Sequence, residues 1–409
     1  MGSISTELLL IILCCLVVLS YLFSVVSRYI KVPSVLLLLF SGVIFQLISN
    51  ANNFHIEIPA TIVEGLGVIG LIMIVLEAGL DLKLGKTKIP LIRSSFFTAL
   101  IILILSTAGI TAILYFWLKE DIVRCIVYAL PLSIMSSSIV LPSIHHLTGY
   151  KKEFLVYEAS FSDILGIIFF NYLTADDILT FKSIGVFSGS IVISIALSLI
   201  LSLLLFLLLT KSKFEIKFFL LLALLILIYS GGKLLHLPSL LIILVFGLMI
   251  SNWQKIPVTR LTTFLKPEEV ESSTKLLHSI TAESSFLIRT FFFILFGYSI
   301  DLRSLLNSEA LTVGSLIVVS LFLIRLIYLR FYLKTKVVPE VFFIPRGLIT
   351  IVLFYKIPPH LKLETFNDGI LFFVILSTGI ILSLGMILYN KENDEVIEDP
   401  QFSERKDIL

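Results

Sequence analysis

Residues 131–142 read PLSIMSSSIVLP and decide which kind of fold the chain can adopt. Two prolines, Pro131 and Pro142, enclose three consecutive serines in a stretch that is otherwise apolar. Proline removes a hydrogen bond from a helix, and serine hydroxyls can satisfy the backbone groups that it frees. The pattern therefore predicts a helix that is broken midway. Inside a membrane such a break persists where it is buried or lines a cavity, and transporters use it to offer oxygen atoms to cations.

The composition around this stretch is that of a polytopic membrane protein. Hydrophobic residues make up 57% of the 409 residues and charged residues 15%, against roughly 45–50% and about 25% in globular proteins. The apolar blocks approach the ~20 residues that a helix needs to cross a bilayer. These values exclude a secreted disulfide scaffold, a nucleic-acid binder and a cytosolic enzyme. The cysteines lie in apolar blocks without metal-ligand spacing: Cys14, Cys15 and Cys125.

Splitting the chain at charge clusters and at Gly, Pro and Asn breaks predicts an all-α protein with about 13 transmembrane helices. The expected spans are residues 6–28, 33–48, 61–82, 89–118, 122–147, 153–174, 184–210, 214–232, 238–253, 278–301, 309–333, 340–357 and 366–390. The first is expected to be a retained helix, because no basic residue precedes it. We expect one transmembrane domain over residues 1–390 and a short tail over residues 391–409.

The loop charges predict the orientation in the membrane. Assigning alternate loops to opposite sides collects most loop lysines and arginines on one side, among them Lys83, Lys88, Lys151 and Lys152. Cytoplasmic loops carry such an excess of positive charge. The N-terminus is therefore expected outside and the C-terminus in the cytoplasm.

A few charged residues remain inside the predicted spans, and each is a functional candidate because a charge in the bilayer is costly. The alternative for each is a structural ion pair that fixes helix packing. The set comprises Glu77, Glu158, Asp163, Arg289, Arg325 and Arg346.

Residues 158–163 read EASFSD and hold the strongest candidate. Asp163 precedes an uninterrupted apolar run, and nothing adjacent in sequence neutralises it. A carboxylate in such a place is expected to bind either a proton or a cation. Glu158 and Ser162 are four residues apart and share one helix face.

Arg325 lies deep in the eleventh span and needs a carboxylate partner, because arginine stays charged even when it is buried. Glu158 is the best candidate. Arg289 could pair with Glu283 or with Asp163, or its side chain could reach the membrane interface. The sequence leaves these alternatives open.

Residues 343–350 read FIPRGLIT and place a second Pro/Gly interruption in the twelfth span, beside Arg346. Two interrupted spans in comparable places of the two halves point to a midplane binding site between inverted repeats. Glu77, near the end of the third span, is interpreted as a packing or loop-anchoring charge. His145 and His146 could sense pH, but loop histidines are usually bystanders.

Several short strings, in this order and spacing, resemble the monovalent cation:proton antiporter superfamily, of the sodium/proton exchanger type. They are KVPSVLL (31–37), LEAGLDL (76–82), Ser136-Ser137-Ser138, Glu158 with Ser162-Asp163, FFFILFGYSID (291–301) and PRGL (345–348).

The resemblance implies a dimerising bundle with a six-helix core of two inverted repeats, whose two broken helices cross near the ion site. The family's ion- and proton-binding acid maps onto Asp163. Asn or Asp usually precedes it, whereas this chain has Ser162, which can ligate a small cation but cannot carry a second proton. The family's basic residue of the eleventh span maps onto Arg325, and the glutamate that pairs with it maps onto Glu158.

We therefore expect a secondary transporter of the plasma membrane that exchanges Na⁺, with Li⁺ or K⁺ as alternatives, for protons. Asp163 and Ser162 would ligate the cation together with Ser136, Ser137 and Ser138, and no cofactor is expected. With one titratable acid at the site the exchange would be electroneutral. The alternatives are a sodium-coupled organic-anion symporter, in which Arg289 would serve as a free cation, and a cation channel. An enzyme is not expected, because the sequence lacks a catalytic constellation.

Overall fold

The computed structural model describes residues 6–389 apart from 52–59, 84, 145–146, 148, most of 175–217, 235–238, 254–266, 306, 334–337 and 364. In this part of the chain there are fourteen α-helices and no strands. The helices are α1 (Thr6–Ile30), α2 (Ser34–Ala51), α3 (Ala60–Asp81), α4 (Ile89–Leu118), α5 (Ile122–Ser133), α6 (Ser137–Ser143), α7 (Gly149–Leu173), α9 (Phe218–Leu234), α10 (Ser239–Ser251), α12 (Pro267–Tyr298), α13 (Leu302–Leu305), α14 (Ser308–Tyr328), α15 (Leu348–Tyr355) and α16 (Asp368–Leu388).

Six segments within the described residues are long and apolar enough to cross a membrane, which confirms the polytopic all-α class. They are Ser34–Ala51, Ile89–Leu118, Ile122–Ser143, Thr274–Tyr298, Ser308–Phe331 and Asp368–Leu388. Shorter apolar helices, such as α9 and α10, coincide with other expected spans.

Two boundaries differ from the expected ones. α12 begins at Pro267, well before residue 278, because its first turns are polar and precede the apolar part of the same helix. α9 continues through Gly231 and Gly232 to Leu234, so this glycine pair does not end the helix. The expected span over residues 184–210 is described in part, chiefly as the apolar helix Ile195–Leu204.

Two spans are interrupted midway, as the proline and serine patterns predict. α5 ends at Ser133 and α6 begins at Ser137. In the other, a short helical turn (Glu340–Phe342) is followed by non-helical chain before α15 begins at Leu348. The two breaks cross: the Ser136 amide donates a hydrogen bond to the Pro345 carbonyl over 3.0 Å.

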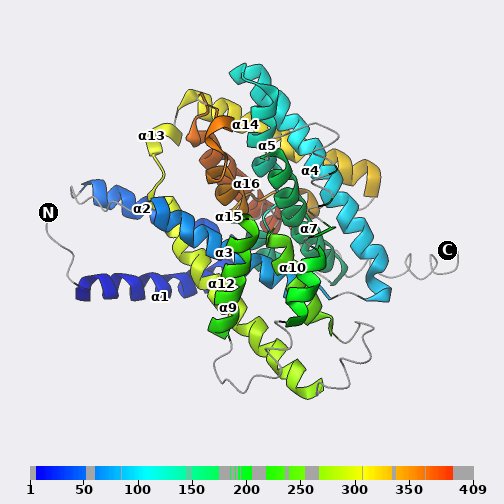
Figure 1. Cartoon of the computed structure of the whole chain (residues 1–409). Coiled ribbons are helices and arrows are strands. Elements are labelled where there is room, and N and C mark those ends of the chain that lie inside the picture. Colours follow the sequence, from blue (N-terminus) through cyan, green and yellow to red (C-terminus); the bar gives the residue numbers. More distant parts are fainter. Residues whose placement is uncertain are drawn as a thin grey trace.

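The helices form two groups with the broken spans between them (Figure 1). α4 packs against α5, α7 and α14, and α14 packs against α16. In the other group α12 packs against α2 and α3, while α10 packs against α3. α15 contacts α3 of one group and α5 and α7 of the other, and α3 also contacts α6. The breaks therefore lie in the interior of the bundle.

Glycine permits a close approach of two helix backbones between α2 and α12. A Cβ atom on Gly42 would lie 2.2 Å from the Ile294 carbonyl oxygen, and one on Gly297 would lie 2.3 Å from the Leu39 carbonyl oxygen. Such small residues are typical of helix contacts in membranes, where close packing drives association.

We predict that Gly42→Ala lowers the stability of the protein, because the added methyl group meets backbone that cannot move away easily. Overpacking of this kind costs about 1–3 kcal/mol. The measurement is the apparent melting temperature in detergent, with Gly65→Ala in α3 as the matched control. A methyl group on Gly65 meets nothing within 4 Å, and alanine favours a helix more than glycine does. Equal melting temperatures for the two variants would contradict the prediction.

Candidate functional site

Asp163 lies on α7 beside the break between α5 and α6. Its side chain is buried, and its Oδ2 atom accepts a hydrogen bond of 3.3 Å from the Ser137 amide. Its Oδ1 atom has no hydrogen-bond partner among the described residues. A buried carboxylate oxygen without a partner is costly. This atom is therefore a place where a proton or a cation can bind with a large gain.

Three consecutive serines, Ser136, Ser137 and Ser138, lie where the break ends and α6 begins, and the middle one contacts this carboxylate. Ser136 and Ser138 share a hydrogen bond of 2.8 Å between their hydroxyl oxygens. The Ser137 hydroxyl, fully buried, has no hydrogen-bond partner in the part of the chain that the structure describes. Ser137 and Asp163 are therefore hydrogen-bonded through the Ser137 amide and the Oδ2 atom. Each of the two residues also has one oxygen without a partner among the described residues.

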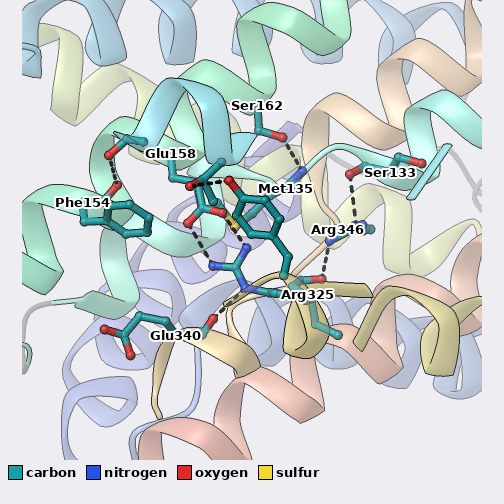
Figure 2. A network of polar contacts seen from close by, with 12 residues as sticks. Ser133, Met135, Phe154, Glu158, Ser162, Arg325, Glu340 and Arg346 are labelled. Atoms are coloured by element: carbon teal, nitrogen blue, oxygen red, sulfur yellow. Dashed lines mark hydrogen bonds and ion pairs between the residues drawn. The ribbon is translucent and has the colours of Figure 1, made fainter. Parts of the chain in front are cut away.

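Ser162 contacts the backbone of the break. Its hydroxyl oxygen accepts a hydrogen bond of 2.9 Å from the amide of Met135, inside the break (Figure 2). It thereby satisfies a backbone donor that the interruption of the helix leaves free. A hydroxyl also has a second lone pair and its own hydrogen, so this contact does not use up its capacity.

Glu158 and Arg325 form a buried ion pair one helical turn from Asp163. Arg325 Nη1 lies 2.6 Å from Glu158 Oε1, and Arg325 Nη2 lies 2.9 Å from Oε2. Both side chains are 1% exposed, and Arg325 Nε also donates to the Glu340 carbonyl over 2.6 Å. The planar guanidinium engages both carboxylate oxygens at once, which is the strong form of this interaction. Figure 2 shows the pair beside Ser162 and Arg346.

Arg346 fills the crossing of the two breaks. Its guanidinium donates to the carbonyl oxygens of Leu132 (2.7 Å), Ser133 (3.1 Å) and Ile344 (2.7 Å). The carbonyls of Leu132 and Ser133 belong to the last turn of α5, where a helix leaves its acceptors unpaired. Arg346 therefore stabilises the end of one broken helix from within the other. The sequence placed it beside the break but gave no sign of these partners.

Arg289 pairs with neither of the partners that were expected for it. Its Nη2 atom lies 3.9 Å from Glu77 Oε2, and its Nη1 atom donates to the Ser138 carbonyl over 3.5 Å. The same Glu77 oxygen accepts a 2.7 Å hydrogen bond from Ser285, while Glu283 accepts one from the Tyr21 hydroxyl. Sequence reasoning missed this contact because Glu77 lies on α3, far away in the chain. The available signal was the spacing of Ser285 and Arg289. They are four residues apart on α12, so they share one helix face, and both contact Glu77.

A cavity of about 620 Å³ leads toward the break. Lys83, Lys88 and Lys152 lie along it, together with Glu77, Arg289 and Ser138. Asp163 does not line this cavity. Ser138 does, and it is the neighbour of the residue whose amide holds Asp163. At Ser138 the cavity therefore adjoins the residue that bonds Asp163. His145 and His146 lie outside the described residues.

Two broken, crossing helices with a buried carboxylate beside them are an arrangement that secondary transporters use near the middle of the membrane. A profile of the family described as sodium/hydrogen exchanger, transmembrane, matches residues 14–388. The chain belongs to this family, whose members are transporters, and it is an integral multi-pass membrane protein.

Solved structures agree with this fold. One structure of the sodium proton antiporter MjNhaP1 from Methanocaldococcus jannaschii, at pH 8, has a TM-score of 0.66 and 19% sequence identity, covering 92% of this chain and 97% of that one. A second, electron-microscopy structure of MjNhaP1 has a TM-score of 0.67 and 17% identity, covering 97% and 99%. At these identities the likeness shows the fold. Among curated protein sequences there is no match.

We predict that Arg325→Ala destabilises the protein strongly, because it leaves the Glu158 carboxylate buried and uncompensated. Breaking a buried pair in this way costs about 3–5 kcal/mol. The double variant Glu158→Gln/Arg325→Met, in which no charge is left unpaired, should recover part of the loss. The measurement is the apparent melting temperature in detergent.

Lys88→Ala is the control for this prediction. Lys88 lies 2.7 Å from Glu153, and both side chains are partly exposed, at 36% and 43%. The hydrogen bond to Glu153 raises the pKa of Lys88, but exposed pairs contribute only about 0–1 kcal/mol to stability. If Arg325→Ala were as stable as Lys88→Ala, the pair with Glu158 would not support the fold.

Proposed function

We propose that the protein exchanges a monovalent cation for protons and that the two compete for Asp163. The observation that carries the proposal is the Oδ1 atom of Asp163, which is buried at the crossing of two broken helices and has no hydrogen-bond partner among the residues that the structure describes. A carboxylate that binds a cation cannot hold a proton on the same oxygen. Movement of one group of helices against the other would then carry one ion at a time.

The neighbouring ion pair supports Asp163 as the exchanging group. Arg325 compensates the charge of Glu158, whereas the described contact of Asp163 is a long hydrogen bond from the Ser137 amide. Glu158 and Arg325 then act as a structural ion pair beside the site. Arg346 would hold the crossing, because it bonds the carbonyls of the α5 end.

The atoms around Asp163 suit a small alkali cation. Hydroxyl, carbonyl and carboxylate oxygens are hard ligands of the kind that such cations prefer. Asp163 and the hydroxyls of Ser136, Ser137 and Ser138 would supply them, with Ser162 through its second lone pair. We propose Na⁺ as the cation, with Li⁺ and K⁺ as the alternatives to be tested beside it.

The same residues suggest a one-for-one exchange. Ser162 stands directly before Asp163, and a hydroxyl cannot carry a second proton at this site. Arg325 and Arg346 remain charged because arginine does not release its proton in proteins. One cation would then replace one proton, and each cycle would move no net charge.

The lysines along the cavity support the orientation in the membrane. Lys83, Lys88 and Lys152 line it, and basic loops face the cytoplasm. We propose that the cavity opens to the cytoplasm, with the N-terminus outside and the C-terminus inside. Residues 1–390 would form the transport domain in the plasma membrane, with residues 391–409 as a tail. The two halves of the transport domain would be inverted repeats, since each half contributes one broken span. We also propose that the protein forms a homodimer.

The position of Arg289 disfavours the organic-anion symporter. Such a transporter would need a cationic side chain that is free to bind the substrate carboxylate. Arg289 instead has an acidic neighbour, Glu77, which already compensates its charge.

We predict that Asp163→Asn abolishes cation-dependent proton movement while the protein still inserts into the membrane. The amide keeps the shape of the side chain but binds neither a proton nor a cation with comparable affinity. The measurement is fluorescence dequenching of a pH dye in everted vesicles after addition of Na⁺, Li⁺ or K⁺ across pH. Asp121→Asn is the control, because Asp121 caps the start of α5 on the surface and asparagine caps equally well. Normal exchange by Asp163→Asn would rule out this site.

We also predict that the exchange rate does not respond to the membrane potential. Purified protein in proteoliposomes would be tested with potassium and valinomycin gradients that set the potential to positive, zero or negative values, with Na⁺ as the exchanged ion. Equal initial rates at all three values are expected for one cation against one proton. A rate that changes with the potential would show that net charge moves in each cycle.

A further inference from the structure

We propose that Arg289 is a tethered cation in the wall of the cavity, which an incoming ion must displace before it reaches Asp163. Arg289 would thereby set the apparent affinity for the cation. The inference deepens the proposed function and rests on it, since it assumes that a cation enters through this cavity toward Asp163.

The position of Arg289 is the first argument. The residue lines the cavity together with Glu77 and Ser138, and it is 9% exposed. Its guanidinium reaches the carbonyl of Ser138, next to the residue whose amide holds Asp163. A cation that moves along the Ser138 side of the cavity toward Asp163 would therefore meet this guanidinium.

The chemistry of its contacts is the second argument. Arg289 touches one carboxylate oxygen and one backbone carbonyl oxygen, which are also the groups that a dehydrated cation seeks. The guanidinium thus occupies oxygen atoms that an entering ion would use, and its own charge repels that ion.

The looseness of these contacts is the third argument. Arg289 lies 3.9 Å from Glu77 and 3.5 Å from the Ser138 carbonyl. Arg325, which we interpret as structural, has contacts of 2.6 and 2.9 Å to Glu158 and is 1% exposed. An arginine that fixes helix packing is expected to resemble Arg325. Long contacts at the wall of a cavity suit a side chain that is displaced in each cycle.

Contacts between α3 and α12 would hold Glu77 in place while the Arg289 side chain is displaced. Ser285, fully buried on α12, donates to Glu77 over 2.7 Å. One turn further along α3, Asp81 lies 2.7 Å from His278 of α12. Glu77 therefore stays fixed between the two helices while the Arg289 side chain moves.

The experiment measures initial exchange rates of proteoliposomes against Na⁺ concentration at one fixed alkaline pH. Arg289→Gln should lower the apparent KM for Na⁺ by about tenfold, because one positive charge is removed from the path. Arg289→Lys, which keeps the charge, should have a KM close to that of the unaltered protein. Glu77→Gln removes the carboxylate that compensates the charge of Arg289. The entering cation then meets a stronger repulsion, so the KM for Na⁺ should rise by about tenfold.

A second measurement is the rise in melting temperature that Na⁺ produces in detergent, since a ligand stabilises the folded state according to its affinity. The Arg289→Gln protein should reach half of this rise at lower Na⁺ than the unaltered protein. If this variant is not recovered folded, Glu77→Gln tests the proposal alone.

An unchanged or higher KM for Arg289→Gln, or an unchanged KM for Glu77→Gln, would overturn the proposal, as would a loss of melting temperature in Arg289→Gln without a change in KM. The proposed function is tested separately by the unaltered protein and Asp163→Asn. If the unaltered protein moves no protons on addition of Na⁺, Li⁺ or K⁺, the proposed function fails. If the unaltered protein moves protons and Asp163→Asn does not, the proposed function holds. The KM values then test the role of Arg289 alone.

Discussion

The hydrogen bond between the Ser136 amide and the Pro345 carbonyl is the contact on which the central architecture depends. A helix interrupted inside a bilayer leaves backbone donors and acceptors that lipid cannot satisfy. Here each interruption satisfies the other, and side chains complete the set: Ser162 accepts from Met135, and Arg346 donates to the end of α5. The two breaks are stable because they cross.

This arrangement leaves Asp163 with spare capacity to accept a hydrogen bond. The backbone groups at the crossing obtain partners, and Glu158 obtains Arg325, but the Oδ1 atom of Asp163 has none among the described residues. The charge of Glu158 is thus compensated by Arg325, whereas the Oδ1 atom of Asp163 is left without such a contact in this part of the chain. A buried carboxylate in a membrane protein is costly and marks a candidate functional site. In a family of sodium/hydrogen exchangers, the candidate ligands of such a site are a cation and a proton.

The three buried arginines illustrate three uses of the same side chain. Arg325 compensates a carboxylate at close range, Arg346 bonds carbonyls at a helix end, and Arg289 lies loosely at a cavity wall. The sequence presents all three as charges within apolar spans and does not separate them. Their roles differ because their partners come from other helices, at distances that only the packing sets.

The sequence by itself determined the membrane class, the two interruptions and the candidate acid, because hydropathy, proline position and an isolated carboxylate are local features. Glu158 could be named as the partner of Arg325 because few carboxylates are available in the spans. The tertiary structure alone decided that Ser162 bonds Met135, that Arg289 lies against Glu77 and that Arg346 holds the crossing. These contacts join residues on different helices, whose relative positions follow from close packing, as between Gly42 and Gly297, and not from any one span.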